Sequence, residues 1–535
     1  MKRTKILFKI TLLCLLSLAL RVYYIAVFQH KTFSSMAEAQ RNFRIQLNGG
    51  RGNIYDRNLI SFTSVGKKKV LAVIKSSDIT GDYSVLNTVD PENANRLFNL
   101  LQEKGIVYID IPWEFDTDQF HQNNVLVFED TKRYRDDGTG ASVIGYLQDG
   151  EGVSGLEFAC ETYLENGDGF SVNIFRDAKG VFIPGFSFKK EQNNGTYLKT
   201  TLDKKYMEIC QQSLRNVKGA AVLLDVKTFD VLAMVSSPSF NPNKMHAFFA
   251  DEHSSLLNRA TSMYDMGSIF KIVVMAAALE NGCVKKDDFF TCDNGKNVGN
   301  VHFVCRNHPE MKKITAEEAF LHSCNAVFID IGQKTEYNNI LDMAMSFGFG
   351  QNLIVPVDFP QNKGILPDEN NYYLADLANL SIGQGKLLGT TVHGAVLSAV
   401  VANKGVRKSV NILDCLLNAD CTLNKSLREN KSVKVISQET ASVLKEMMIK
   451  TVRYGTGKSA KADGVSCGGK TGSAQTGMLL DGQDVVHGWF TGFFPVDEPK
   501  YALCVFVENG RSGAKSAAPI FSKIQEEIAK AEGWI

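Results

Sequence analysis

The chain has 535 residues, of which 44% are hydrophobic and 22% are charged. This composition is typical of a globular protein and excludes a fibrous or wholly disordered chain, while the length indicates about two to four domains. Fifty-nine basic and 58 acidic side chains leave a formal net charge of +1. This near-zero net charge does not indicate the excess of basic residues that is typical of nucleic-acid binding, and we expect no nucleic-acid partner.

The amino terminus has the pattern of a membrane anchor. Basic residues between Lys2 and Lys9 precede an apolar stretch that continues to Phe28 and is interrupted by Arg21. Residues 6–28 are enough to cross a bilayer, since about 20 helical residues suffice. The nearest small-x-small cleavage pattern, Ala37-Glu-Ala39, lies too far downstream for a usual signal peptide. We therefore predict an uncleaved anchor in residues 1–28, with the amino terminus in the cytoplasm and the rest of the chain outside.

Residues 29–195 have a pattern that differs from the rest of the chain. Short β-like runs at Lys69–Ile74, Val125–Phe128 and Ser171–Phe175 alternate with charged, glycine-bearing turns, which favours an extended, mostly β module. Gly185–Gly195 is typical of a linker. We therefore predict a separate domain over residues 29–195.

Residues 196–535 show a mixed pattern. Helical spacing over Tyr206–Val217 is followed by two buried strand patterns, Ala220–Asp225 and Val231–Ser236. Helical segments dominate from Ser268, and glycine-punctuated strands return near the end of the chain. The order predicts an α/β (α+β) domain with an antiparallel sheet and a helical block.

The first motif with catalytic potential is Ser268-Ile-Phe-Lys271. Gly267 and the apolar run that follows place Ser268 in the first turn of a buried helix, so that Lys271 stacks beside the serine hydroxyl. A desolvated lysine can activate a serine as a nucleophile. The motif alone is weak, because Ser-x-x-Lys also occurs by chance at Ser64, Ser187, Ser442 and Ser512.

The second motif is Ser323-Cys-Asn325, between an amphipathic and an apolar helical stretch. A hydroxyl and a carboxamide two residues apart at a helix junction can both face one cleft, where the hydroxyl could pass a proton and the amide could hold a peptide bond. The alternative is that the two side chains only cap the second helix.

The third motif is Lys470-Thr471-Gly472, followed by Ser473. The glycine that a phosphate-binding loop would require upstream is absent, which excludes the nucleotide interpretation. A strand with small residues lets a substrate backbone lie close against it. Lys470 and the two hydroxyls then form a compact site for a carboxylate.

The cysteine pattern in the sequence does not predict a metal site. The spacing of Cys292, His302, Cys305 and His308 matches no standard zinc pattern. A local disulfide between Cys292 and Cys305, or two plain thiols, is the preferred interpretation, and we predict no metal ligands.

Together the three motifs are far more specific than any one of them, and their set is that of penicillin-binding proteins and class A β-lactamases. The sequence resembles the class B, monofunctional penicillin-binding proteins over nearly its whole length. Met266, Ile269 and Ser473 depart from the residues usual in that family. Further blocks that resemble the family are Gly49–Asn58 and Val153–Glu157 before residue 195, and Ala220–Asn243, Ser381–Gly385 and His487–Gly492 after it.

The resemblance implies a transpeptidase domain over residues 196–535, a pedestal over 29–195 and four catalytic residues. Ser268 would attack the penultimate D-Ala carbonyl of a peptidoglycan stem peptide, and Lys271 would act as general base. Ser323 and Lys470 would relay the proton to the departing D-Ala.

The resemblance also implies the substrate-binding residues and the partners. Asn325 would orient the donor peptide bond, while Thr471, Gly472 and Ser473 would line the donor and bind its terminal carboxylate. An amine of a neighbouring stem would resolve the acyl-enzyme into a cross-link, and β-lactams would acylate Ser268. No cofactor is implied, and a polytopic glycosyltransferase in the bacterial cell membrane is the expected partner.

Two alternatives use the same residues. A D,D-carboxypeptidase or a β-lactamase would use water as the acceptor, although the long pedestal argues against a lone β-lactamase. A non-catalytic β-lactam sensor would bind at Ser268, although nothing before the anchor resembles an output domain.

Overall fold

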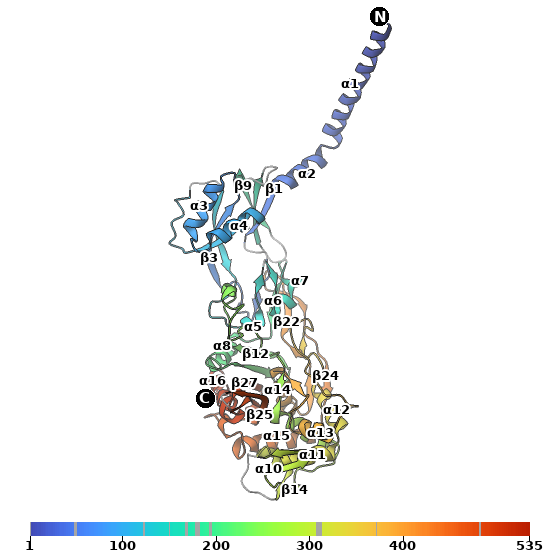
Figure 1. Cartoon of the computed structure of the whole chain (residues 1–535), viewed down its shortest axis with the longest axis vertical. Helices are drawn as coiled ribbons and strands as arrows, with labels where there is room; N and C mark the ends of the chain where they lie inside the picture. The colour runs from blue at the N-terminus through green and yellow to red at the C-terminus, as the bar shows by residue number, and fades with distance from the viewer. Residues whose placement is uncertain are drawn as a thin grey trace. The chain divides into compact units, whose positions relative to one another are not determined.

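The computed structural model describes residues 2–47, 51–120, 124–148, 150–165, 169–176, 182–191, 195–305, 313–370, 372–480 and 483–535 (Figure 1). Its contacts divide the chain into two compact units that alternate along the sequence. The first contains Met1–Arg51, Gly66–Lys132 and Gly167–Gly195; the second contains Gly52–Val65, Arg133–Asn166 and Thr196–Ile535. Two segments of the expected pedestal, 52–65 and 133–166, thus fold with the carboxy-terminal residues.

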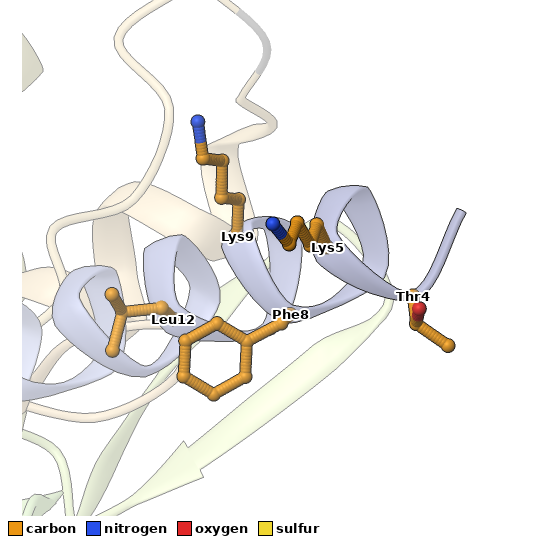
Figure 2. A pocket seen from close by; sticks show the side chains of 5 residues that line it. All are labelled: Thr4, Lys5, Phe8, Lys9 and Leu12. Carbon is orange, nitrogen blue, oxygen red and sulfur yellow. The ribbon is translucent and has the colours of Figure 1, made fainter. Parts of the chain in front are cut away.

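The amino-terminal helix α1 spans Lys2–Phe28 and is followed by α2, His30–Arg41. Residues 3–28 of α1 are long and apolar enough to cross a membrane, and none of this stretch is buried against protein. The lysines Lys5 and Lys9 extend away from Phe8 and Leu12 around a shallow hollow on this helix (Figure 2). The predicted apolar helix is confirmed, and its outward apolar side chains suit a lipid environment.

The first unit has two antiparallel sheets. Strand β3 (Gly66–Ile74) pairs with β4 (Ile106–Ile111) and β5 (Val125–Lys132). Helices α3 (Ile79–Val89) and α4 (Ala94–Lys104) supply Val85, Leu86, Leu97 and Leu101 to a small core with Leu71 and Val73 of β3. The predicted strands are confirmed, but the mostly β pattern of the sequence did not indicate these two helices.

The second sheet of this unit corrects the predicted linker. It has the order β1 (Asn42–Leu47), β8 (Gly169–Arg176) and β9 (Phe182–Glu191), all antiparallel. The linker prediction is wrong over residues 185–191, because these residues belong to β9 and complete an extended ladder with β8. The alternating Phe186 and Phe188 have the period of a strand. The charges around them obscured that period.

A buried ion pair organises the first segments of the second unit. The carboxylate of Glu157 is fully buried and accepts hydrogen bonds from Arg133 at 2.6 and 3.0 Å and from the Tyr134 hydroxyl at 2.9 Å. Arg133 also donates to the carbonyl of Gly52 at 3.2 Å. Gly52 and Glu157, which come from two of the sequence blocks noted above, therefore meet at Arg133.

A five-stranded antiparallel sheet forms the centre of the second unit. On β26 (Gln483–Phe494), Thr491 donates to the carbonyl of Gly394 in α14 (Thr391–Ala402) at 2.6 Å. The neighbouring Phe490 packs on Phe521 of α16 (Ala518–Ala531), with ring centroids 4.6 Å apart. Because successive strand residues point to opposite faces, α14 and α16 cover the two faces of the sheet. Its order is β12 (Val231–Ser237), β11 (Gly219–Asp225), β27 (Tyr501–Gly510), β26 (Gln483–Phe494) and β25 (Gly468–Leu480).

Helices build the rest of this unit, and two of them are buried almost throughout. These two, α9 (Lys271–Glu280) and α14 (Thr391–Ala402), carry long apolar runs and lie inside the core. The predicted α/β architecture with its antiparallel sheet and helical block is confirmed. The other main helices are α8 (Lys204–Ser213), α10 (Ala316–Leu321), α11 (Asn325–Thr335), α12 (Tyr337–Phe347), α13 (Leu374–Ser381), α15 (Gln438–Arg453) and α16 (Ala518–Ala531).

Candidate active site

Ser268 lies at the start of the buried helix, as the sequence predicts. A short 3-10 turn, Gly267–Phe270, runs directly into α9, and Ser268 is half-buried. Gly267 has φ of 55° and donates its N–H to the carbonyl of Gly383 at 2.8 Å. A Cβ at Gly267 would lie 2.8 Å from the carbonyl oxygen of Ser473 on β25. Glycine here therefore lets the turn that carries Ser268 approach the edge strand.

Lys271 connects the first motif to the second. Its side chain is fully buried, and Nζ donates to the Ser323 carbonyl at 2.8 Å, to Ser323 Oγ at 3.3 Å and to Asn325 Oδ1 at 2.8 Å. Within the described part of the chain, Lys271 makes no hydrogen bond to the Ser268 hydroxyl. Burial lowers the pKa of Lys271 to about 8, and the neighbouring Cys324 and Cys305 partly oppose this shift. A substantial fraction of this lysine is therefore neutral near physiological pH.

Ser323 and Asn325 belong to the junction between α10 and α11. Ser323 is buried and has φ of 57°, an uncommon left-handed conformation for a residue with a side chain. The N-cap of α11 is Cys324, and no side chain caps the helix there. Asn325 instead accepts from Lys271 and donates Nδ2 to the carbonyl of Val304 at 3.3 Å. The capping interpretation of this motif is therefore wrong, and both side chains instead accept hydrogen bonds from Lys271.

The third motif lies on β25, the edge strand of the central sheet. Lys470 is fully buried, donates to the Thr471 carbonyl at 3.2 Å and lies 5.6 Å from the ring centroid of Phe320. Burial lowers the pKa of Lys470 well below its ordinary value, and the charge of Lys271 lowers it further. Two lysines therefore share this interior, and the charge of Lys271 disfavours the charged form of Lys470.

Two further residues of β25, Gly472 and Ser473, lie close to other segments: the turn that carries Ser268 and the backbone at Gly513. A Cβ on Gly472 would lie 3.0 Å from Ile269 Cγ2 and 3.1 Å from the carbonyl oxygen of Met266. Ser473 is exposed, and its Oγ accepts from the N–H of Gly513 at 3.1 Å. The absence of a side chain at residue 472 therefore helps the strand to lie close to the Ser268 turn.

Thr471 has a partner that the sequence did not single out. Its hydroxyl lies 2.7 Å from that of Thr456, which follows α15. No motif marks Thr456 in the sequence, and only the fold brings these two hydroxyls together.

The structure thus brings all three motifs to one place. Lys271, Ser323 and Asn325 are joined by hydrogen bonds, Gly267 approaches Ser473, and Lys271 lies close enough to Lys470 to lower the pKa of Lys470. Such a constellation can activate a serine hydroxyl with a neutral amine and bind an anionic substrate beside it.

The structure places a third cysteine, which the sequence spacing did not indicate, beside Cys292 and Cys305. Cys292 and Cys305 are both buried, and the third sulfur beside them belongs to Cys324 of the second motif. His302 is hydrogen-bonded to Asn297 instead, and His308 lies outside the described residues.

Comparison with known proteins agrees with this geometry. The family model described as the penicillin-binding protein transpeptidase domain matches residues 219–526. This match covers more than half of the chain, which therefore belongs to that family, and the resemblance to class B penicillin-binding proteins is confirmed.

Two curated relatives show how far the similarity extends. The chain is 30% identical to penicillin-binding protein PbpB of Mycolicibacterium smegmatis over 74% of its own length and 64% of that protein's length. It is 26% identical to peptidoglycan D,D-transpeptidase MrdA of Acinetobacter baumannii over 96% of its own length and 86% of that protein's length. The chain thus spans somewhat less than two thirds of the PbpB relative.

Solved structures share the fold. The apo structure of penicillin-binding protein 3 from Mycobacterium tuberculosis has a TM-score of 0.66 at 23% identity, covering 91% of this chain and 97% of that chain. The same protein has also been solved in complex with aztreonam and with ampicillin.

Proposed function

We propose that this protein is a peptidoglycan D,D-transpeptidase that acts through an acyl-enzyme on Ser268. The observation that carries the proposal is the hydrogen-bonded group of Lys271, Ser323 and Asn325 one helical turn from the Ser268 hydroxyl. Membership of the transpeptidase family and the name of the MrdA relative support the same reaction.

Lys271 is the general base in this proposal. A neutral amine has two N–H groups and one lone pair, and the Ser323 carbonyl and Asn325 Oδ1, both at 2.8 Å, are acceptors for the two N–H groups. The lone pair is then left for a hydroxyl proton. Lys271 takes the proton of Ser268 as Oγ attacks the penultimate D-Ala carbonyl.

Ser323 and Lys470 complete the acylation step. When the tetrahedral intermediate collapses, the bond between the carbonyl carbon and the nitrogen of the terminal D-Ala breaks. Ser323, which lies 3.3 Å from Lys271 Nζ, passes the proton towards that nitrogen with the help of Lys470. D-Ala leaves as a neutral amine, and the donor stem remains as an ester on Ser268.

The strand β25 binds the donor. Gly472 leaves room for an extended peptide beside the strand, and Asn325 orients the peptide bond. The hydroxyls of Thr471 and Ser473 bind the terminal carboxylate. The backbone N–H groups of Ser268 and Ser473 stabilise the oxyanion.

An amine of a neighbouring stem then attacks the ester carbonyl, the bond from that carbon to Ser268 Oγ breaks, and the proton that the amine loses returns to Ser268 through Lys271, which leaves the cross-link and the free enzyme. A β-lactam follows the first half of this path and leaves Ser268 acylated. The aztreonam and ampicillin complexes of the Mycobacterium tuberculosis protein support this part of the proposal. The chemistry uses no cofactor.

The same proposal includes location and partner. Helix α1 anchors the chain in the bacterial cell membrane by a single pass, with the basic residues before it in the cytoplasm. A polytopic glycosyltransferase in that membrane supplies the glycan strands. A reporter fused after residue 45 is expected to be active only outside the cytoplasm.

Covalent labelling tests the nucleophile. Fluorescent penicillin is expected to label the wild-type chain at Ser268, and Ser268→Ala is expected to abolish the label while the thermal unfolding midpoint stays within a few degrees. Full labelling of that variant, or an adduct mapped to Ser64, Ser187, Ser442 or Ser512, would contradict the assignment.

A further inference from the structure

One tryptophan connects the central sheet to the segment that leads to the nucleophile. Trp489 lies on β26, its side chain is fully buried, and its indole N–H donates to the main-chain carbonyl of Asp265 at 2.9 Å. Asp265 ends the short strand β13, Tyr264–Asp265, and only Met266 separates it from the turn that carries Ser268. We propose that Trp489 is a positioning residue that fixes the Ser268 turn through this one hydrogen bond. This role rests on the proposed function, in which Ser268 is the nucleophile.

The sheet in turn holds the indole in place. Trp489 lies opposite Gly472 on β25 and opposite Phe506 on β27, and its ring centroid is 4.4 Å from that of Phe506. The ring of Tyr264 packs on the same Phe506, with centroids 4.1 Å apart. Both residues of β13 are therefore bound to the sheet, Tyr264 by its ring and Asp265 by its carbonyl. In so densely packed an interior the indole N–H is a fixed donor for the chain that precedes the turn.

Trp489 also meets the strand that passes the nucleophile turn. A Cβ on Gly472 would lie 3.1 Å from Trp489 Cβ and 3.1 Å from the Met266 carbonyl oxygen, so the indole strand, β25 and the start of the turn converge there. In the proposed reaction the oxyanion takes one N–H from the turn, at Ser268, and one from β25, at Ser473. A hydrogen bond that fixes the turn relative to the sheet therefore fixes the spacing of these two donors. A misplacement of about 1 Å at such a site can slow the reaction about 100-fold.

The alternative is that the tryptophan only fills space. A space-filling role needs the ring but not its N–H, whereas this N–H is aimed at a carbonyl three residues before Ser268. A second hydrogen bond, from the N–H of Gly267 to the Gly383 carbonyl at 2.8 Å, holds the chain on the other side of Met266. The chain that enters the turn is thus fixed at two neighbouring points, one of which is the indole. The effect of Trp489 on the reaction passes through the main chain.

An isosteric replacement separates the N–H from the ring. In the full, detergent-solubilised chain, Trp489→3-benzothienylalanine, introduced by suppression of an amber codon, puts sulfur in place of the N–H and keeps the shape of the ring. Stopped-flow acylation by benzylpenicillin is expected to show a first-order rate constant at least about tenfold lower than in the wild type. The dissociation constant of the preceding non-covalent complex should stay within about twofold of the wild-type value, because Trp489 sets the oxyanion donors rather than the binding strand. The thermal unfolding midpoint should stay within a few degrees.

The chain offers a matched control. Trp534 stacks on Tyr501, and its indole N–H makes no hydrogen bond within the described part of the chain. Trp534→3-benzothienylalanine is therefore expected to acylate as the wild type does. Trp489→Phe, which keeps an aromatic ring and loses the N–H, is expected to lower the rate constant at least as much as the sulfur analogue does.

Four results would overturn the role of Trp489. The first two are acylation of the sulfur analogue within about twofold of the wild-type rate, and a loss that lies wholly in the dissociation constant. The third is a failure of the analogue to fold or a fall of its unfolding midpoint by more than about 10 °C, which would make the N–H a support of the whole domain. The fourth is a wild-type chain that is not acylated at Ser268, which removes the proposed function and this role with it. If the wild type is acylated at Ser268 and the analogue reacts equally fast, only the role of Trp489 fails.

Discussion

The ammonium nitrogen of Lys271 donates to the side-chain oxygen of Asn325 at 2.8 Å, and this bond joins the nucleophile helix α9 to the start of α11. Asn325 is in turn fixed by its donation to the Val304 carbonyl. The base and the residue proposed to orient the substrate are therefore positioned by each other. A change in either one is expected to affect both acylation and donor binding.

Acylation is expected to depend on pH through Lys271. Burial lowers the pKa of this lysine to about 8, and only its neutral form can take the Ser268 proton. Below pH 8 the neutral fraction rises about tenfold per pH unit, and above pH 8 it saturates. The rate constant for acylation by benzylpenicillin should therefore rise from pH 6 to 8 and level off by pH 9. A flat profile over that range would exclude Lys271 as the titrating base.

Removal of the amine should have a large effect on the same rate. Lys271→Met keeps the length and the apolar stem but has no base, so acylation should slow by about 10²–10⁴-fold. Lys67→Met is the matched control, because Lys67 also ends a Ser-x-x-Lys motif but is an exposed partner of Glu129. Stopped-flow or gel-based labelling kinetics measure both variants. Equal rates for the two variants would remove Lys271 from the mechanism.

The close approach of β25 to the nucleophile turn predicts a steric effect. Gly472→Ala places a methyl group 3.0 Å from Ile269 Cγ2 and 3.1 Å from both the Met266 carbonyl oxygen and Trp489 Cβ. Overpacking of this kind costs about 1–3 kcal/mol and moves the strand away from Ser268, so penicillin acylation should slow. Gly66→Ala, whose Cβ meets nothing within 4 Å, should leave labelling unchanged. Normal acylation by Gly472→Ala would show that the strand does not pack as described.

The fully buried Glu157 carboxylate predicts a stability effect away from the site. Glu157→Ala leaves the mostly buried Arg133 guanidinium without its carboxylate partner, and loss of one member of a buried pair costs about 3–5 kcal/mol. Glu498→Ala breaks the exposed pair with Lys227 in the same unit and should cost less than about 1 kcal/mol. Denaturant unfolding of the second unit measures both free energies. Similar small losses in the two variants would show that Arg133 finds other partners.

Patterns local in sequence predicted much of this structure. The long apolar stretch, interrupted only by Arg21 after Lys9, predicted α1. Two apolar runs around a turn predicted β11 and β12, and Gly267 with its apolar continuation predicted the turn that carries Ser268. Each of these depends on residues that are neighbours in the chain, where periodicity and composition act directly.

Features that depend on distant residues could not be predicted in the same way. The positive φ of Ser323 and the hydroxyl contact between Thr456 and Thr471 exist only after α10, α11 and β25 have packed. The sulfur atoms of Cys292, Cys305 and Cys324 lie within 4.8 Å of one another, although no standard ligand spacing relates these positions. Helix α3 was missed because its short, Thr- and Val-containing sequence has weak helical propensity and is stabilised by packing on β3.

The most direct test of the proposed reaction is product analysis on nascent glycan. Acyl transfer to an amine exceeds transfer to water only when the acceptor stem is held near the ester on Ser268, which can supply several kcal/mol of the barrier. The full chain, supplied with lipid-linked precursor and a partner polymerase, should yield cross-linked muropeptide dimers, and Ser268→Ala should yield none. Free D-Ala with trimmed monomers only, under the same conditions, would contradict the transpeptidase account and indicate a hydrolase.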